Sequence, residues 1–389
     1  MGNQYTNWQL NFIIGELFDC VFFSLSFFFS IFFPYLCKMN SKRTRIAATL
    51  SIVMPVFNHP EELKTMINSI LANTFQNWEL LVVDDGSEQE TLSILEFYAG
   101  KDERIRFIKR RRAPKGAQTC RNIGMEMATG KYIIFFDSDD YITPYCLEQR
   151  VKELEAHPEL DFMVFRNGIF GDDGFHTEPN EKCYGYLTYG DDIAAFCART
   201  LPYIVWNNIY LLEALRIHNI IWDESLLSLQ DGDFNLQTLL AGLRYGYAQT
   251  QPDYGYRIAG NNSSVSKKII STTHLNSHLH SVEKNYRTVQ KRHGSKYDKA
   301  LFFGVQFIYS TAFATKAHDE QAQKLVDIIA QYSPRYGRMF LAKVKAHHFL
   351  RRFCPDKLAK EIVMADYLIW LKWKQWQVAS AKKNSSQQQ

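Results

Sequence analysis

The 389-residue sequence lacks several patterns that mark common classes of protein. Its seven cysteines are scattered without a CxxC pair, which excludes a zinc site of the usual spacing and favours reduced thiols in a cytosolic compartment. No G-x-G-x-x-G follows the first predicted strand, which disfavours a dinucleotide-dependent dehydrogenase. Internal repeats and long low-complexity linkers are also missing, so a solenoid or a largely disordered chain is excluded.

The net charge of the chain narrows the classes of partner that it could bind. A formal net charge of +4 and a pI near 8.5 fit an enzyme that handles anionic substrates or lies near anionic lipid, but they predict no nucleic-acid partner. The hydrophobic share of 46% and the charged share of 22% are typical of a globular protein. The length allows two or three structural units, each with a core of its own.

Residues 1–48 form a hydrophobic N-terminal segment with two open interpretations. Val21–Cys37 is apolar and rich in phenylalanine, and basic residues follow it from Lys38 onward, so it could be a short membrane anchor with the rest of the chain in the cytoplasm. A cleaved signal peptide fits poorly, because no positive region precedes the apolar run and no A-x-A-like site follows it. Alternatively, translation starts at Met39 and the upstream segment is an artefact. Both interpretations place the remaining chain on the cytosolic side.

From Thr49 onward, short apolar runs alternate with segments of helical periodicity. The predicted strands are Leu50–Val56, Glu79–Val83, Ile105–Ile108 and Tyr132–Phe136. The predicted helices between them are Glu61–Ala72, Thr91–Tyr98 and Ala117–Ala128. This alternation predicts an α/β fold with a doubly wound, mostly parallel, Rossmann-like sheet.

The second half of the chain is less regular. Phe162–Arg166 and Tyr203–Tyr210 have strand-like or mixed character, and Asp233–Ala241 has helical periodicity. Beyond about residue 275 the chain reads as mainly helical, and it ends in the polar tail Lys382–Gln389, which is expected to fray. We therefore expect a catalytic domain over residues 49–275 and a helical C-terminal region over residues 276–389.

Two acidic clusters follow predicted strands directly. Asp137-Ser138-Asp139 comes after the apolar strand Tyr132–Phe136, and Asp84-Asp85-Gly86-Ser87 comes after Glu79–Val83. Ligands of doubly wound sheets bind beyond the carboxyl ends of the strands, so both clusters are candidates for a site. Carboxylates in a D-x-D arrangement can hold Mn²⁺ or Mg²⁺ beside a diphosphate, whereas helix capping is the structural alternative. A carboxylate of the other cluster can accept hydrogen bonds from a base or a ribose, whereas a strand-to-helix turn is its alternative.

Three blocks of sequence together resemble the family 2 glycosyltransferases, which have the GT-A fold. They are LSIVMPVFNHPEELKTMINSILANTFQNWELLVVDDGS, KGAQTCRNIGMEMATGKYIIFFDSDDYITP and LQDGDFNLQTLLAGLRYGYAQTQPDYGYRI, and they cover roughly residues 49–260. The sequence is most similar to bacterial members that build capsular, exopolysaccharide or lipopolysaccharide chains. The resemblance implies a metal-dependent, inverting transfer of a sugar from a nucleotide-sugar donor to a glycan or lipid-linked acceptor.

The resemblance also implies roles for particular residues. Pro55, Val56, Phe57 and Asn58 would line the base pocket, Asp85 would read the base with support from Asp84, and Arg121 would lie near the nucleotide. Asp137 would contact the sugar or the ribose, Asp139 would ligate Mn²⁺ or Mg²⁺, and Asp231 would be the general base. A carboxylate at that position could deprotonate the acceptor hydroxyl as it attacks the anomeric carbon.

The sequence departs from the family pattern at three places. Gln230 precedes Asp231 where the family usually has glutamate, and Asp233 is a nearby rival for the role of base. Asn208 replaces a usual lysine in the segment around Trp206. No histidine follows Tyr254–Arg257, so no histidine metal ligand is assigned, although Arg257 could neutralise a diphosphate.

Two further features have competing interpretations. The basic run Lys109–Arg112 could attract an anionic donor or a lipid phosphate, but such runs are usually solvated, and we favour that interpretation. Near the C-terminus, Trp370, Trp373 and Trp376 alternate with lysines. This pattern fits either an amphipathic helix at a membrane surface or a helix packed on the catalytic domain.

We also weighed two other functions. A sugar nucleotidyltransferase would also use carboxylates and a metal, but its Gly-rich phosphate loop is replaced here by Pro55–Asn58. A non-catalytic nucleotide-sugar-binding or scaffold protein would keep the fold and lose the chemistry, which the retained Asp139 and Asp231 disfavour.

Overall fold

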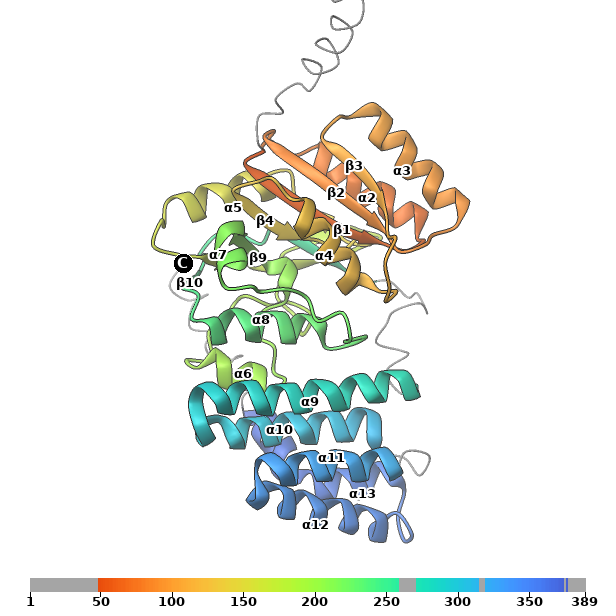
Figure 1. Ribbon diagram of the computed structural model, residues 1–389, viewed down its shortest axis with the longest axis vertical. Helices are drawn as coiled ribbons and strands as arrows, with labels where there is room; N and C mark the ends of the chain where they lie inside the picture. The colour runs from red at the N-terminus through yellow and green to blue at the C-terminus, as the bar shows by residue number, and fades with distance from the viewer. Residues whose placement is uncertain (1–47, 259–270, 315–318, 374–375, 377–389) are drawn as a thin grey trace, which may run out of the picture. The chain divides into compact units, whose positions relative to one another are not determined.

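The computed structural model describes residues 48–258, 271–314, 319–373 and 376 (Figure 1). Residues Ala48–Gln389 form one compact unit. The candidate anchor Val21–Cys37 and the polar tail Lys382–Gln389 lie outside the described residues. Among the residues that are described, no helix is both long and apolar enough to cross a bilayer.

The strands are β1 (Leu50–Val56), β2 (Trp78–Asp84), β3 (Ile105–Lys109), β4 (Tyr132–Phe135), β5 (Tyr141–Ile142), β6 (Phe162–Val164), β7 (Asn167–Gly171), β8 (Gly174–His176), β9 (Asn208–Leu211), β10 (Tyr245–Tyr247) and β11 (Tyr254–Arg257). The α-helices are α2 (Pro60–Leu71), α3 (Gln89–Lys101), α4 (Ala117–Met127), α5 (Cys146–Glu155), α6 (Asp192–Cys197), α7 (Leu212–Ile217), α8 (Gln230–Ala241), α9 (Thr272–His293), α10 (Asp298–Ile308), α11 (Asp319–Tyr332), α12 (Pro334–Leu350) and α13 (Asp356–Val363). Short helical turns are η1 (Val205–Asn207), η3 (Gly294–Tyr297) and η4 (Tyr309–Phe313).

The main sheet has seven strands in the order β10-β6-β9-β4-β1-β2-β3. Strands β1 to β4 are mutually parallel where they pair, and β9 runs antiparallel to both of its neighbours, β4 and β6. A smaller sheet has the order β5-β11-β7-β8. The prediction of a mostly parallel α/β sheet is therefore confirmed.

Strand β1 is buried on both faces because helices cover both sides of the sheet. Ile52 and Met54 pack into one apolar cluster with residues of α2, while Val53 belongs to a second cluster that includes Met125 of α4. Alternate side chains of a strand point to opposite faces, which explains this division. A continuous apolar sequence such as LSIVMPV is what such a strand requires.

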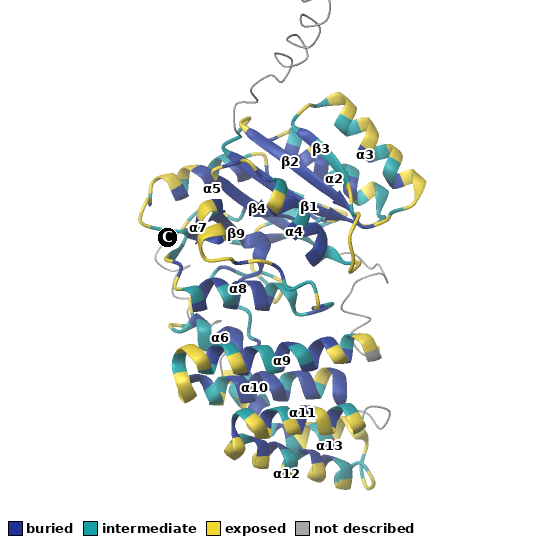
Figure 2. Cartoon of the chain, viewed as in Figure 1, coloured by how far each residue is buried: buried dark blue, intermediate teal, exposed yellow. Residues whose placement is uncertain are grey.

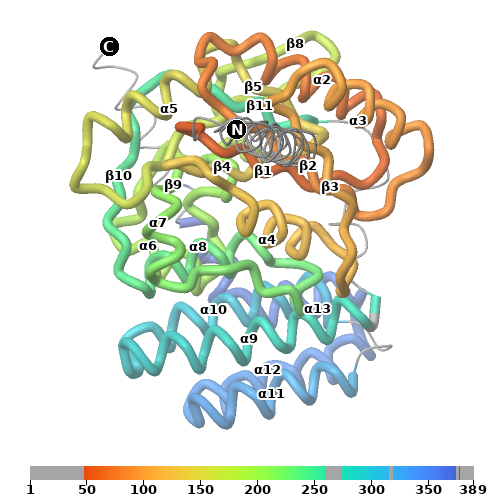
Figure 3. The backbone as a smooth tube through the Cα atoms, turned by 45° about the horizontal axis from the view of Figure 1, so that its top comes forward, coloured from red at the N-terminus to blue at the C-terminus, as the bar shows by residue number. Residues whose placement is uncertain are grey.

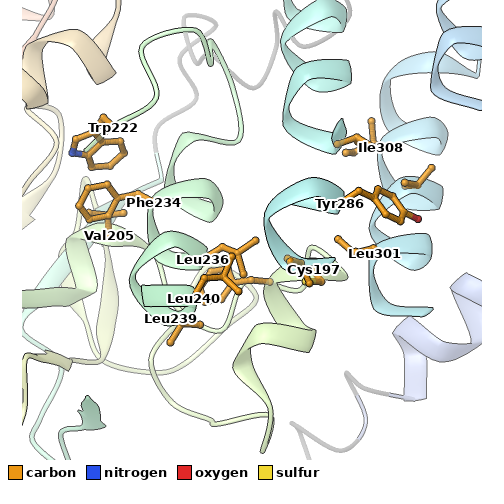
Figure 4. Packing of buried hydrophobic residues seen from close by; sticks show 14 of the residues in the cluster. Cys197, Val205, Trp222, Phe234, Leu236, Leu239, Leu240, Tyr286, Leu301 and Ile308 are labelled. Atoms are coloured by element: carbon orange, nitrogen blue, oxygen red, sulfur yellow. The ribbon is translucent and has the colours of Figure 1, made fainter. Parts of the chain in front are cut away.

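The second cluster extends from the sheet into the helical region. Figure 4 shows Trp222 and Phe234 at one end and Tyr286, Leu301 and Ile308 at the other. Helices α9 to α12 lie side by side in both Figure 1 and Figure 3, and the cluster continues into α12. The mainly helical character predicted beyond residue 275 is thus confirmed, with α9 beginning at Thr272.

Helix α8 begins earlier than the sequence pattern predicted. It starts at Gln230 rather than Asp233, so Asp231 lies in its first turn. The residue before it, Leu229, has a left-handed backbone with φ of 64° and offers no capping side chain. Because leucine gives no helix-start signal, only the later periodicity was visible in the sequence.

Candidate active site

The end of β2 carries the first acidic cluster. The carboxylate of Asp84 accepts hydrogen bonds from the backbone N–H groups of Gly86 and Ser87, at 3.1 and 3.0 Å. Asp84 therefore shapes the turn after β2. The backbone N–H of Asp85 donates to the carbonyl of Val56 at 2.8 Å, which ties the ends of β1 and β2 together.

The carboxylate of Asp85 is buried and already has partners. It accepts a hydrogen bond from Nε of Arg110 and another from the backbone N–H of Gly116, the latter at 3.1 Å. Arg110 follows β3, so β2 and β3 both contribute to this part of the site. The interpretation of Lys109–Arg112 as simply solvated is wrong for Arg110, whereas Arg112 is exposed and forms surface ion pairs with Glu126 and Glu224.

The residues predicted to line a base pocket differ in how far their side chains are buried. Pro55 and Val56 lie in β1 with their side chains buried, and Val56 belongs to the apolar core. Phe57 is 45% exposed, and the Nζ of Lys115 lies 3.7 Å from its ring centroid. Asn58 accepts from the backbone N–H of Glu88 at 2.9 Å. Phe57 and Asn58 are therefore the members of this group whose side chains reach the edge of the sheet.

Arg121 of α4 connects the ends of two distant segments. One guanidinium nitrogen lies 2.6 Å from the Asp137 carboxylate, which follows β4, and the other lies 3.2 Å from Oε1 of Gln230 in α8. The flat guanidinium also stacks 4.4 Å above the ring of Trp222. Arg121 is buried, so these contacts hold the end of β4 and the start of α8 against each other.

Gln230 fits this arrangement as an amide. Its Oε1 accepts from Arg121, while its Nε2 donates to Oε1 of Gln118 at 2.9 Å and to the carbonyl of Leu226 at 3.0 Å. A glutamate has no N–H group and could not make the last two bonds. The glutamine that this chain has in place of the usual glutamate therefore fits the hydrogen-bond partners around it.

Asp231 is half-buried in the first turn of α8, beside Arg121 and Asp137. Removal of the carboxylate from bulk water raises its pKa to about 6, with Asp137 adding to the rise and Arg121 opposing it. A carboxyl group with such a pKa is largely ionised at neutral pH and is a stronger base than an ordinary aspartate.

Asp233, the rival for the role of base, has other partners. Its carboxylate is 2.8 Å from Nζ of Lys284 in α9 and 2.7 Å from Nε2 of Gln237. The same Lys284 also lies 2.8 Å from Asp223. Because the carboxylate of Asp233 is already bound in this ion-pair network, Asp231 is the better candidate for the general base.

Beyond β4, Asp139 and Asp140 face different surroundings. Asp140 is buried and accepts hydrogen bonds from the hydroxyl of Tyr254 and from the backbone N–H of Arg257. Burial and the neighbouring carboxylates of Asp139 and Asp137 raise the pKa of Asp140 well above its ordinary value. Asp140 therefore fastens the D-x-D loop to β11, while the carboxylate of Asp139 reaches solvent.

The residues around Asp139 fit a divalent cation that is shared with a ligand. Within the described part of the chain, Asp139 forms no ion pair, whereas Asp137 is neutralised by Arg121. The described residues contain no group of three or more His, Cys, Asp or Glu side chains that could hold a metal alone. One carboxylate with phosphate oxygens and water is a common way to hold Mg²⁺ or Mn²⁺. A donor diphosphate would have to complete such a site.

Comparison with known proteins decides the family. The model described as "Glycosyl transferase family 2" matches residues 51–209. The chain is 40% identical over 185 residues to an Escherichia coli protein, UDP-Glc:alpha-D-GlcNAc-diphosphoundecaprenol beta-1,3-glucosyltransferase WfgD, covering 44% of this chain and 71% of that relative. This chain belongs to the family 2 glycosyltransferases.

Two other relatives are less similar in sequence, at 27% and 28% identity. Glycosyltransferase YibD of Escherichia coli K12 is 27% identical over 56% of this chain and 63% of its own length. Glycosyltransferase EpsH of Bacillus subtilis is 28% identical over 54% of this chain and 60% of its own length. The chain thus spans about three fifths of the length of these two relatives.

The solved structures support the same fold. The crystal structure of S. aureus TarS residues 1–349 in complex with UDP-GlcNAc superposes with a TM-score of 0.62 at 20% sequence identity. The match covers 82% of this chain and 91% of the TarS fragment. It therefore extends beyond the family model, which ends at residue 209, and the GT-A fold predicted from sequence is confirmed.

Several residues of this family 2 site were not singled out by the sequence. Arg110 was read as part of a solvated run, although it binds the predicted base-reading carboxylate. Tyr254 and Asp140 meet only when β11 folds beside the D-x-D loop, and Lys284 comes from a helix more than fifty residues away from Asp233. No local pattern indicates such contacts, because they depend on the tertiary pairing of distant elements.

Proposed function

We propose that the chain is an inverting glycosyltransferase that moves one sugar from a nucleoside diphosphate sugar to a glycan or lipid-linked acceptor in cell-surface polysaccharide synthesis. We take a UDP-sugar as the first candidate donor. The relative WfgD is named for UDP-glucose and for a diphosphoundecaprenol-linked acceptor, and the TarS fragment was crystallised with UDP-GlcNAc. Both names support this choice of donor, and the first supports a lipid-linked acceptor.

One observation carries the proposal. Arg121 holds Asp137, at the end of β4, and Gln230, at the start of α8, on opposite sides of one guanidinium group. Asp231 follows Gln230 directly and has a pKa of about 6 because of its burial and its proximity to Asp137. A candidate base therefore faces the strand end at which the donor diphosphate of this fold is expected.

The reaction would proceed as a single displacement. Asp231 would take the proton from the acceptor hydroxyl while its oxygen forms a bond to the anomeric carbon. The bond from that carbon to the diphosphate oxygen would break at the same time, and its electron pair would leave with the nucleoside diphosphate. Attack on the face opposite the leaving group inverts the anomeric configuration.

Other residues would bind and orient the donor. Asp85, with Arg110 beside it, offers hydrogen-bond acceptors and donors to a base, and Phe57 offers an exposed ring at the same edge. Asp139 would hold a Mn²⁺ or Mg²⁺ ion, which would supply positive charge to stabilise the departing diphosphate. Arg257, whose Nη2 is buried without a hydrogen-bond partner in the described structure, would add a further positive charge near Asp139.

The proposal is tested by measuring binding and hydrolysis of a panel of UDP- and GDP-sugars by the full chain, with and without Mn²⁺. We expect metal-dependent binding of one donor, and we expect Asp139→Ala to weaken it at least tenfold. The matched control is Asp173→Ala, because Asp173 is an exposed aspartate whose partner, His176, lies on β8.

The alternatives give different results in the same assay. A folded chain that binds a nucleotide sugar but turns none over with any acceptor would favour a binding or scaffold protein. Release of pyrophosphate from a nucleoside triphosphate and a sugar phosphate would indicate a sugar nucleotidyltransferase. Either result would overturn the proposed transfer.

A further inference from the structure

Exposed apolar side chains are concentrated in the last part of the described chain. Eight of the thirteen exposed large apolar residues in the described structure lie between residues 339 and 376. Ile369 is 68% exposed and Phe353 is 74% exposed. Figure 2 shows exposed positions along α12 and α13. Scattered exposed apolar residues are normal, but a concentration in one segment marks a surface that binds something.

Four of these residues lie in two successive helical stretches, α13 and residues 365–373, and together we call them the C-terminal stripe. Its members are Leu358, Ile362, Ile369 and Trp373. Helical hydrogen bonds continue past the end of α13, because the N–H of Met364 donates to Lys360 and its carbonyl accepts from Leu368, both at 3.0 Å. At 3.6 residues per turn, Leu358 and Ile362 in α13 lie about 40° apart around the helix axis, and Ile369 and Trp373 lie about 40° apart in the stretch after the turn at Met364.

The opposite face of the same segment is already packed. Tyr367 is buried, and the ring of Trp370 stacks on Phe303 of α10 with the ring centroids 4.6 Å apart. Trp370 is therefore a packing residue, so the interfacial alternative does not hold for this tryptophan. The segment has an inner apolar face packed on α10, and on its outer side Leu358, Ile362 and Ile369 are 47%, 52% and 68% exposed.

The charge around the C-terminal stripe is strongly positive. Residues 334–373 contain nine lysines and arginines and three aspartates and glutamates. Lys357 and Lys372 are exposed beside the stripe, and neither forms an ion pair with any described residue. Arg352 is exposed in the turn between α12 and α13, next to Phe353. Apolar residues flanked by free cations complement a surface with an apolar interior and anionic groups at its boundary.

We propose that the C-terminal stripe docks the protein on the surface of an anionic lipid membrane, with the apolar side chains inserted at the headgroup boundary. Lysine stems can lie along the acyl region while their ammonium groups remain in water with the lipid phosphates. Protein–protein interfaces are usually depleted in lysine, so the composition favours lipid over a second protein. The tryptophans at the end of the segment have the apolar ring and polar N–H that suit this boundary.

Vesicle binding by the full chain tests this proposal without any sugar donor, so its outcome is independent of the proposed transfer. The vesicles are phosphatidylcholine and phosphatidylglycerol at a ratio of three to one, compared with phosphatidylcholine alone. We expect binding to the anionic vesicles, and we expect Ile362→Ser with Ile369→Ser to weaken it at least tenfold. The matched control, Phe97→Ser with Ile217→Ser, replaces two equally exposed apolar residues outside the helical region.

A second readout separates the C-terminal stripe from any lipid contact made elsewhere in the chain. Brominated phosphatidylcholine in the same vesicles quenches tryptophans that reach the acyl region. We expect Trp373→Phe with Trp376→Phe to remove a share of this quenching, whereas Trp370→Phe, which keeps its ring on Phe303, removes none. Lys357→Gln with Lys372→Gln should reduce binding to anionic vesicles several-fold.

Three results would overturn the proposal. The first is that the folded chain binds neither kind of vesicle. The second is that it binds equally well after Ile362→Ser with Ile369→Ser, with unchanged tryptophan quenching. The third is that these substitutions dissolve a dimer seen by light scattering while vesicle binding is absent, which would make the stripe an interface between two copies.

Discussion

The side chain of Asp231 combines two properties that rarely occur together in an aspartate. It lies in the first turn of a helix, where the backbone N–H groups favour a negative charge, yet its pKa is raised to about 6 by burial and by Asp137. The raised value means that the carboxylate holds a proton more readily than a solvated one. It can therefore accept a proton from a hydroxyl and still be ionised at neutral pH.

The pH dependence of transfer follows from this value. Below pH 6 the carboxylate of Asp231 is protonated and cannot act as a base, so kcat/KM should fall about tenfold for each pH unit below that point. Above pH 7 the rate should be flat until another group titrates. The measurement is a pH profile of kcat/KM with a saturating metal concentration. A rate that stays constant from pH 7 to pH 4.5 would exclude Asp231 as the base.

Asp231→Asn should separate binding from chemistry. The amide keeps the size of the side chain but cannot accept the proton, so we expect kcat to fall at least 1,000-fold while the donor Kd changes less than threefold. Donor binding by calorimetry and transfer by product analysis would measure the two effects. Asp233→Asn is the comparison, and full activity of Asp231→Asn with loss of activity in Asp233→Asn would reverse the assignment.

Gln230→Glu restores the residue that the family usually has and should shift the pH profile. The new carboxylate would compete with Asp137 for Arg121 and place a negative charge beside Asp231, raising the pKa of Asp231 further. We expect the acid limb of the profile to move upward by roughly half a pH unit or more. Gln89→Glu, an equal change of charge on exposed α3, should leave the limb in place. A downward shift in Gln230→Glu would contradict this account.

Helix α8 depends on α9 for its position. Nζ of Lys284 in α9 lies 2.8 Å from the carboxylates of both Asp233, in the first turn of α8, and Asp223, in the preceding loop. Loop and helix are thus fixed to the same ammonium group on either side of Asp231. The C-terminal helical region therefore contributes to the position of the candidate base.

Lys284→Met should cost substantial stability, because it leaves the buried carboxylate of Asp233 without its counter-ion. We expect the free energy of unfolding to fall by about 3 kcal/mol, measured by urea denaturation. Adding Asp233→Asn should recover part of this loss. Lys324→Met is the control, since the pair of Lys324 with Glu320 is exposed to solvent and should contribute little to stability. Equal losses of stability in Lys284→Met and Lys324→Met would show that Lys284 contributes no more than an exposed ion pair does.

The sequence predicted the elements with strong periodicity and missed contacts that join distant elements. The strands from Leu50 to Phe136 and their acidic ends were visible because fully apolar runs and Asp-rich turns are local patterns. The start of α8 was predicted at Asp233 instead of Gln230, because Leu229 is not a capping residue and gave no signal of a helix start. The ion pairs of Arg110 and Lys284 could not be predicted, since each joins residues that are distant along the chain and has no periodic signature.

At Gly304 the helical region makes a close backbone contact with the catalytic region. A Cβ added there would lie 2.1 Å from the carbonyl oxygen of Cys197 in α6, so α10 can approach α6 only because this position is glycine. Gly304→Ala should force the two helices apart and lower the free energy of unfolding by about 1–3 kcal/mol. Gly100 in α3 has open space where a Cβ would lie, so Gly100→Ala should leave the free energy of unfolding unchanged or raise it. Unfolding by urea distinguishes the two variants.

The apolar core passes without interruption from Val53 in the sheet to Phe340 in α12. Replacing the helical region of this chain with one from another protein would therefore cut through its core. A foreign helical region would have to match the surface of α6 and α8 side chain by side chain, including the close contact at Gly304.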